Sequence, residues 1–254
     1  MIRIVSAILI FSCAAMAQAP VDPHDLSGHW NRTSGTQSFS NVPSGGRGQT
    51  GAQEAPLTAE GKKMLDANKP GYGPRASIVR NDPMVKCEPL GLVRNINTEV
   101  AAPHSTFEIL QAPGRVVQFF EYHHDWREIW MDGRKLPSLD DAYNKWNGYS
   151  VGRWEGDTLV VDSIGFDPRS WLDKFGYPHS DEMRVTERYR RVDADTLELI
   201  MTITDPTLYS KPWSSDRKLF KINRERAKEW DEQIYCVPSD EFSFNELIQY
   251  DKKD

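Results

Sequence analysis

Positive charge and long apolar runs are both scarce in this chain. Its 254 residues include 31 Lys and Arg against 37 Asp and Glu, for a net charge of -6. Because nucleic acids and anionic membranes attract basic surfaces, this balance argues against both as the main partner. Beyond the N-terminus no stretch approaches the ~20 apolar residues of a transmembrane helix. We therefore expect a folded protein with no nucleic-acid partner and no transmembrane segment.

Signatures of cofactor and metal chemistry are also missing. The glycine-rich stretches follow no predicted strand, so they do not form dinucleotide-binding fingerprints. The six histidines lack the HxH and HExxH spacings of common metal sites, although histidines from separate strands could still converge. His179, Ser180 and Asp181 are adjacent, and adjacent residues cannot adopt the geometry of a catalytic triad. We expect no metal and no cofactor.

Residues 1–17 have the order of a secretory signal peptide: a positive start, a short apolar run and small residues. Cleavage after Ala17 is preferred to cleavage after Ala19, which would leave Pro20 at the new N-terminus. Processing as a lipoprotein at Cys13 is the alternative. The sequence predicts an exported protein, either periplasmic or secreted.

Export affects how the three cysteines are interpreted. Cys13 leaves with the signal peptide, so Cys87 and Cys236 remain as an even pair in an oxidising compartment. A disulfide between them closes a very long loop, worth at most ~4–5 kcal/mol in the chain-entropy model. Metal ligation and a reactive thiol are the alternatives, and neither cysteine has a neighbouring Cys or His. We predict a Cys87–Cys236 disulfide.

The rest of the chain divides into an irregular beginning and a β-rich body. Residues 18–55 are expected to form a mobile arm, and 56–254 a single domain. Thr58 is expected to cap a short helix that ends at Asn68, and a segment at 70–105 to wrap the domain. A last short helix is expected near 239–247. Strand patterns occur at 106–111, 115–122, 125–131, 148–154, 157–163, 182–192, 196–204, 215–223 and 230–237.

Eight or nine consecutive strands predict a closed or nearly closed antiparallel β-barrel, with a two-sheet β-sandwich as the alternative. Glu155 and Gly156 are expected to turn a hairpin in which Trp154 faces Asp157. This register pairs Tyr149 with Asp162 at the open end of the hairpin, where a barrel has its mouth.

The segment 119–130 is the densest functional candidate. A single strand through it would be unusually long, so a bulge or tight turn is expected at His123–His124. Such a turn would bring imidazole and carboxylate groups together as an acid–base pair beside an aromatic cavity. The alternative is a hydrogen-bonded pair of surface histidines. Without a turn, alternation would place Phe120, Tyr122, His124, Trp126 and Trp130 on one face, and Glu121, His123, Asp125 and Arg127 on the other.

Two segments carry a resemblance. WREIWMDGR at 126–134 and GYSVGRWEGDTLVVDS at 148–163 are similar to a family of uncharacterised secreted proteins of Proteobacteria and Acidobacteria. The similarity extends over most of the chain from about residue 56. It implies no reaction, and the fold it implies is lipocalin-like. Leu26–Trp30 also resembles the Gly-x-Trp opening of lipocalin-type barrels. We therefore expect one lipocalin-like barrel with short flanking helices.

Two function classes, and a third behind them, fit these features. The first is an enzyme that applies cofactor-independent acid–base chemistry, as a lyase, isomerase or cyclase, to a small apolar or aromatic molecule in a barrel cavity. The second is a periplasmic carrier of such a molecule, and the third is an interaction protein of the cell envelope. The density of acid–base residues near strand ends favours the enzyme.

The site residues proposed for these functions fall into two groups. His124 is the expected base or acid, Asp125 or Asp162 its orienting partner, and Tyr149 a hydrogen-bond donor, with His179 in reserve. Arg127 could anchor a carbonyl, phenolate or carboxylate. Apolar contact is expected from Phe120, Tyr122, Trp126, Trp130 and Trp154. The alternating charges of Glu187–Arg191 predict a solvated strand face with cross-strand ion pairs.

Overall fold

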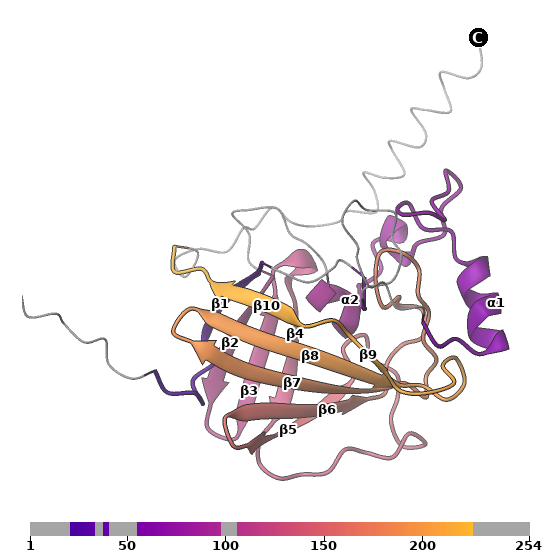
Figure 1. Ribbon diagram of the computed structural model, residues 1–254. Helices are drawn as coiled ribbons and strands as arrows, with labels where there is room; N and C mark the ends of the chain where they lie inside the picture. Colours follow the sequence, from indigo (N-terminus) through magenta and orange to yellow (C-terminus); the bar gives the residue numbers. More distant parts are fainter. Residues whose placement is uncertain (1–20, 34–37, 41–54, 98–105, 226–254) are drawn as a thin grey trace, which may run out of the picture.

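The computed structural model describes residues 21–33, 38–40, 55–97 and 106–225, which form a β-barrel with two α-helices outside it (Figure 1). The predicted lipocalin-like barrel is confirmed, and the sandwich alternative is wrong. The strands are β1 Gly28–Arg32, β2 Phe107–Ala112, β3 Arg115–Phe120, β4 Asp125–Trp130, β5 Tyr149–Glu155, β6 Thr158–Ile164, β7 Arg184–Asp193, β8 Thr196–Thr204, β9 Trp213–Ser214 and β10 Lys218–Ile222.

Nine strands close the barrel, because β10 pairs with both β1 and β8. Every neighbouring pair is antiparallel except β4 and β5, which are parallel. Directions cannot alternate all the way around a ring with an odd number of strands, so one parallel pair is required. The connection 131–148 allows it by carrying the chain back along the bottom of Figure 1 before β5 begins.

Helix α1, Ala59–Ala67, forms where the sequence predicts it. The Thr58 hydroxyl accepts a hydrogen bond from the Gly61 N–H at 3.0 Å, which satisfies one of the free donors of the first turn. Gly61 also lets the helix approach the connection between β8 and β9, since a Cβ there would lie 2.2 Å from the Leu208 carbonyl oxygen. In the wrapping segment the structure adds a 3-10 helix, η1 (Pro83–Lys86), and helix α2 (Leu92–Asn97), whose side chains are all buried.

The β5–β6 hairpin differs from the predicted register by two residues. Glu155 pairs with Thr158, so the two turn residues are Gly156 and Asp157. Gly156 has a φ of 58°, a value that glycine adopts without steric cost. Because a shift by two residues preserves which side chains share a face, Tyr149 and Asp162 lie on the same face of the hairpin in both registers. The predicted pairing of Tyr149 with Asp162 is wrong, since Tyr149 lies opposite Ile164.

Large side chains fill the barrel. The ring of Phe107 lies 6.4 Å from that of Phe120, 6.5 Å from that of Tyr189 and 4.8 Å from that of Phe220, and all four are buried. Core aromatics at these distances contribute both area and specific ring packing. Phe120 therefore belongs to the hydrophobic core.

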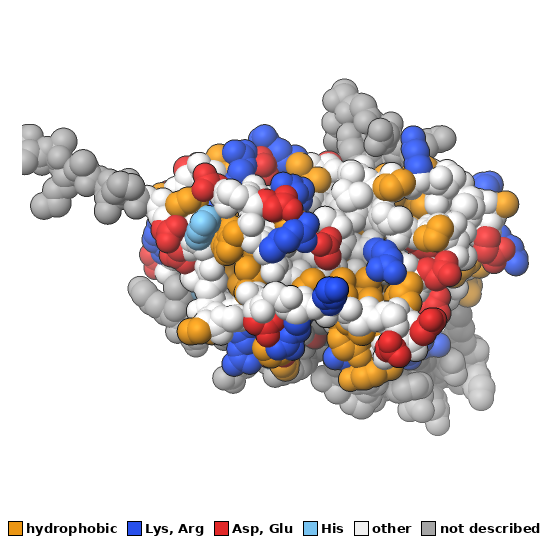
Figure 2. Space-filling view, turned by 90° about the horizontal axis from the view of Figure 1, so that it is seen from below, with side chains coloured by type: hydrophobic (Ala, Val, Ile, Leu, Met, Phe, Trp, Pro, Cys, Tyr) orange, Lys and Arg blue, Asp and Glu red, His pale blue; other side chains and the backbone are white. Residues whose placement is uncertain are grey.

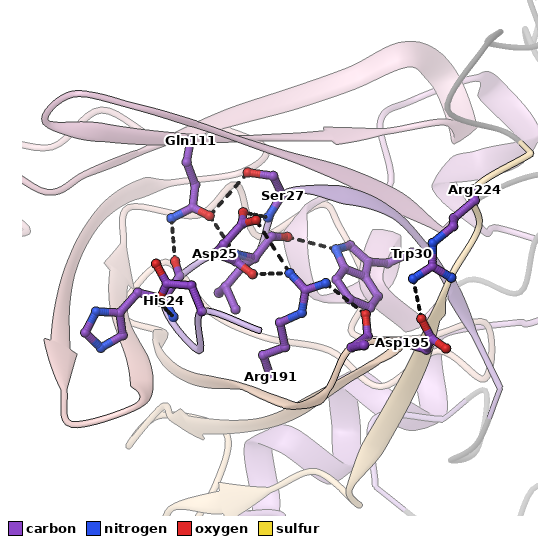
Figure 3. A network of polar contacts seen from close by, with 11 residues as sticks. His24, Asp25, Ser27, Trp30, Gln111, Arg191, Asp195 and Arg224 are labelled. Atoms are coloured by element: carbon purple, nitrogen blue, oxygen red, sulfur yellow. Dashed lines mark hydrogen bonds and ion pairs between the residues drawn. The ribbon is translucent and has the colours of Figure 1, made fainter. Parts of the chain in front are cut away.

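The segment before β1 closes one end of the barrel (Figure 3). Trp30 is fully buried, and its indole N–H donates to the Leu26 carbonyl at 2.9 Å. The Arg191 guanidinium lies over the Trp30 ring at 5.6 Å and donates to the carbonyls of Asp25 and Ala194. The Gln111 amide accepts from Leu26 N–H and donates to the His24 carbonyl. These bonds fix the Gly-x-Trp segment that the sequence singled out.

Some expectations fall partly or wholly outside the described residues. The predicted strand 215–223 corresponds to the shorter β10, and the short strand β9 precedes the predicted range. The signal peptide, most of the arm, the strand at 230–237 and the helix near 239–247 lie outside. Cys87 is in a disulfide, and its partner, Cys13 or Cys236, also lies outside, so the Cys87–Cys236 pairing stays a prediction. No helix in the described ranges is long and apolar enough to cross a membrane.

Candidate functional site

The tight turn predicted between β3 and β4 is confirmed. It is the 3-10 helix η2, Tyr122–His124, and it brings Phe120 opposite Asp125. His123 and His124 have φ values of 61° and 51°, which residues with a Cβ adopt at a cost. The reversal sets the faces of β4, so that the single-strand grouping no longer holds: Phe120 points into the barrel core while Trp126 and Trp130 face outward.

A cleft of about 600 Å³ opens on the outer side of β4 and β5. It exists because these strands share only two residue pairs, Ile129 with Ser150 and Trp130 with Val151. The connection 131–148 returns beside them. The volume is in the range of small-molecule sites. The lining residues are Asp125–Glu128, Trp130, Arg134–Pro137 and Lys145–Val151.

Aromatic rings and cations alternate along this cleft. The exposed fraction of Trp126 is 53%, high for so large an apolar residue. The Arg134 guanidinium stacks 3.7 Å from the centre of the Trp130 ring, and the Lys145 ammonium lies 4.0 Å from the centre of the Tyr149 ring. Partial burial and a hydrogen bond with Tyr143 raise the pKa of Tyr149, so its phenol is neutral at pH 7.

The charges of the cleft are not all compensated. Glu128 forms an ion pair with Arg115 at 2.8 Å, and Arg134 forms one with Asp132. Among the described residues, no carboxylate lies within ion-pair distance of Lys135 or Lys145. Figure 2 looks at the molecule from below, and there hydrophobic side chains lie among Lys and Arg side chains. The cleft thus offers apolar surface together with two lysines that no carboxylate of the described ranges neutralises.

Asp125 lies at the edge of the cleft and is held only by neutral donors. Its Oδ2 accepts from the Asn147 side-chain amide at 2.8 Å and from that of Asn95 at 3.2 Å. Its Oδ1 accepts from the Trp126 backbone N–H at 2.8 Å. These bonds fix the carboxylate without neutralising it.

The neighbouring histidines do not form the expected pair with Asp125. All hydrogen bonds to the Asp125 carboxylate come from Asn95, Asn147 and the Trp126 backbone, and His124 does not line the cleft. The His123 ring stacks on Tyr122 at 4.4 Å, and burial lowers the pKa of His123. The other aromatic of the turn, Tyr122, directs its hydroxyl to the Met84 sulfur at 3.3 Å.

Three more predicted site residues lie away from the cleft. His179 is buried, with Nε2 at 2.8 Å from the Ser170 hydroxyl and Nδ1 at 2.9 Å from the Ser180 carbonyl oxygen. Burial lowers the pKa of His179, so its ring is neutral at pH 7. Asp162 lies on the outer surface of the barrel, where it pairs with Arg153 at 2.6 Å. Trp154 stacks on His24 at 4.3 Å. The structure therefore brings together Asp125, Trp126, Arg127, Trp130 and Tyr149 at the cleft, and none of the others.

Sequence reasoning missed a polar cluster inside the barrel. The Arg127 guanidinium forms two bonds to Glu187, at 2.7 and 2.8 Å, and the Tyr189 hydroxyl donates to Glu187 at 2.7 Å. Gln118 accepts from Arg127 at 2.9 Å, and the Ser150 hydroxyl lies 3.4 Å away. Burial opposes the charge of Arg127, but the Glu187 carboxylate outweighs it and raises the pKa of Arg127.

The prediction that Glu187–Arg191 is a solvated face is therefore wrong for two of its five residues, Glu187 and Tyr189. Glu187 is 0% exposed and Tyr189 is buried, because β7 alternates between the interior and solvent. Arg188 and Arg190 do face solvent and form cross-strand ion pairs with Glu155 and Glu198, as predicted. The sequence signal was the period of two along the strand: Glu187 lies two positions after the apolar Val185 and therefore points to the same, inner face.

Two further chemistries find no support in the geometry. Residues 148–152 read Gly-x-Ser-x-Gly, but Ser150 lies inside β5 and bonds to Ser163 at 2.8 Å, not at the strand-to-helix turn of a nucleophile elbow. In the part of the chain that the structure describes, no three His, Cys, Asp or Glu side chains are grouped to hold a metal ion. No protein-family model, curated protein or solved structure matches the chain.

Proposed function

We propose that the cleft between β4 and β5 binds a small planar molecule with an anionic group, such as an aromatic carboxylate or phenolate. The supporting observation is the combination of exposed aromatic surface at Trp126 with two lysines, Lys135 and Lys145, that have no carboxylate partner in the described part of the chain. We further propose that the chain is exported and carries this ligand in the periplasm or outside the cell.

The chemistry of the cleft favours such a ligand over an uncharged apolar one. A flat ring would bury its faces against Trp126 and Trp130, which removes apolar area from water. An anionic substituent would gain a charge-assisted hydrogen bond from the lysine ammonium beside Tyr149. The interior of the barrel is less suitable, because large aromatic side chains and the Arg127–Glu187 pair occupy it.

A second candidate is acid–base catalysis on the same ligand, of the lyase or isomerase type. It is favoured by Asp125, whose carboxylate is fixed at the cleft by Asn95 and Asn147 as a general base would be. Tyr149 lines the same cleft with a neutral phenol that can donate a proton or a hydrogen bond. In this case Lys145 would position the anionic group.

The binding proposal is tested by titrating aromatic carboxylates and phenolates into the protein and following tryptophan fluorescence and heat. Lys145→Met should weaken binding of an aromatic carboxylate about tenfold, the loss of one charge-assisted bond. Trp126→Ala should weaken it for both charged and uncharged rings. The matched control is Lys63→Met on α1, a lysine away from the cleft. Equal affinity of Lys145→Met and the wild type would refute the proposal.

Catalysis is tested on whichever ligand binds. Incubation of the ligand with the wild-type protein should yield product. Asp125→Asn should abolish turnover while leaving the affinity for an aromatic carboxylate without an amino group unchanged. A ligand that is bound but returned unaltered at every pH would leave the carrier function.

A further inference from the structure

We propose that the Asp125 corner of the cleft is a binding site for an ammonium group, so that the ligand of the cleft carries an amine as well as an anionic group. This inference rests on the proposed function for the aromatic and anionic parts of the ligand. It concerns a different set of atoms at the Asp125 edge of the cleft.

The first observation is a carboxylate without a counter-ion. The other acidic side chain that lines the cleft, Glu128, has Arg115 as its counter-ion. Asp125 has three hydrogen-bond donors, all of them neutral amides, and none of the described Lys, Arg or His side chains lies within ion-pair distance of it. A half-buried carboxylate in this position attracts a cation.

The second observation is a set of buried acceptors that no donor reaches. The side-chain amides of Asn95 and Asn147 are more than nine-tenths buried, and both point their nitrogen at the same oxygen of Asp125. This fixes the orientation of each amide, because only its nitrogen can donate. Each Oδ1 is buried and accepts no hydrogen bond from the described residues.

His123 adds a third acceptor to this corner. His123 lies two residues before Asp125 in the η2 turn, and its Nε2 is buried without a hydrogen-bond partner among the described residues. Since burial lowers the pKa of His123, this ring is neutral at pH 7 and can offer a lone pair there. Buried polar atoms are normally hydrogen-bonded, so three such acceptors beside one free carboxylate select a group rich in donors.

An ammonium group supplies what this corner lacks. It brings a positive charge for Asp125 and three N–H donors for the surrounding acceptors, and it has no lone pair to clash with them. Together with the unpaired lysines, the cleft then presents both signs of charge around an aromatic wall. The ligand class that fits is an aromatic zwitterion, built like an aromatic amino acid.

The test compares four probes on the wild-type protein: 3-phenylpropanoate, phenylalanine, 2-phenylethylamine and ammonium chloride. We expect phenylalanine to bind about tenfold more tightly than 3-phenylpropanoate, which differs from it only by the amine. Ammonium chloride should compete with 2-phenylethylamine but not with 3-phenylpropanoate. Equal affinities of phenylalanine and 3-phenylpropanoate would overturn the ammonium site and leave the proposed function standing. If no aromatic probe binds, both fail.

Variants then place the effect on Asp125. Asp125→Asn should remove the advantage of phenylalanine over 3-phenylpropanoate, whereas Asp162→Asn, a carboxylate change away from the cleft, should keep it. Unfolding curves of each variant show whether the fold is retained. The comparison of the four probes on the wild-type protein tests the proposal even if the Asp125→Asn variant does not fold. An amine preference that survives in a folded Asp125→Asn protein would overturn it.

Discussion

Replacing Arg127 with methionine should destabilise the protein strongly. The side chain is buried and forms five hydrogen bonds, two of them to Glu187. Without it, Glu187 keeps its charge inside the barrel with Tyr189 as its remaining donor. Breaking one side of a buried pair costs about 3–5 kcal/mol, because the other charge is left uncompensated. For a domain of this size, that loss lowers the melting temperature by about 6–20 °C.

The double variant Arg127→Met/Glu187→Leu provides the decisive comparison. It removes both charges and fills the space with apolar atoms, so we expect it to regain at least about 2 kcal/mol of what the single variant loses. Gln118 loses a partner in both variants, which limits the recovery. Urea unfolding followed by tryptophan fluorescence measures each free energy. The reasoning is refuted if Arg127→Met costs under about 1 kcal/mol, or if the double variant is no more stable than the single one.

Three further predictions concern stability. Gly148→Ala should lower the free energy of unfolding clearly more than Gly114→Ala. Both glycines have positive φ, but of the two only Gly148 would place a Cβ against a backbone oxygen, 2.6 Å away. Equal losses of unfolding free energy in urea would contradict this. Because burial lowers the pKa of His179, this histidine takes up a proton at higher pH in the unfolded chain than in the folded protein. The free energy of unfolding should therefore fall as the pH drops below about 6.5, and His179→Gln should flatten that pH dependence. Burial also lowers the pKa of Lys218 to about 8 from 10.5. The free energy of unfolding of the wild type should therefore rise between about pH 8 and 10 relative to that of Lys218→Met. Parallel pH curves of the two proteins would contradict this prediction.

Local signals in the sequence were sufficient for helix α1 and most strands of this fold, but they did not indicate β1, η1 or α2. Thr58 caps α1 because its hydroxyl supplies the acceptor that the first turn lacks. The tight turn at His123–His124 followed from the length limit of a strand, and the barrel from the number of alternating segments. The predicted register of the β5–β6 hairpin was shifted by two residues, but it still placed Tyr149 and Asp162 on one face, because side chains alternate with a period of two.

The candidate site was predicted only in part. One cleft is lined by Asp125, Trp126, Arg127, Trp130 and Tyr149, but it lies on the outer side of β4 and β5, a position that no pattern in the sequence indicated. Its position depends on the single parallel pair, which a ring of nine strands requires.

What the sequence by itself determined is therefore the class of fold, most strand positions and the segment around β4 that carries the site. Only the tertiary structure decided which carboxylates acquire a cation. Glu187 meets Arg127 across the barrel, sixty positions away in the chain, and Asp162 meets Arg153 on the outer surface. Asp125 instead meets Asn95 and Asn147 and keeps its charge free. The Arg153–Asp162 pair forms within the β5–β6 hairpin, whereas the Arg127–Glu187 pair depends on closure of the barrel, which brings together side chains far apart in the chain.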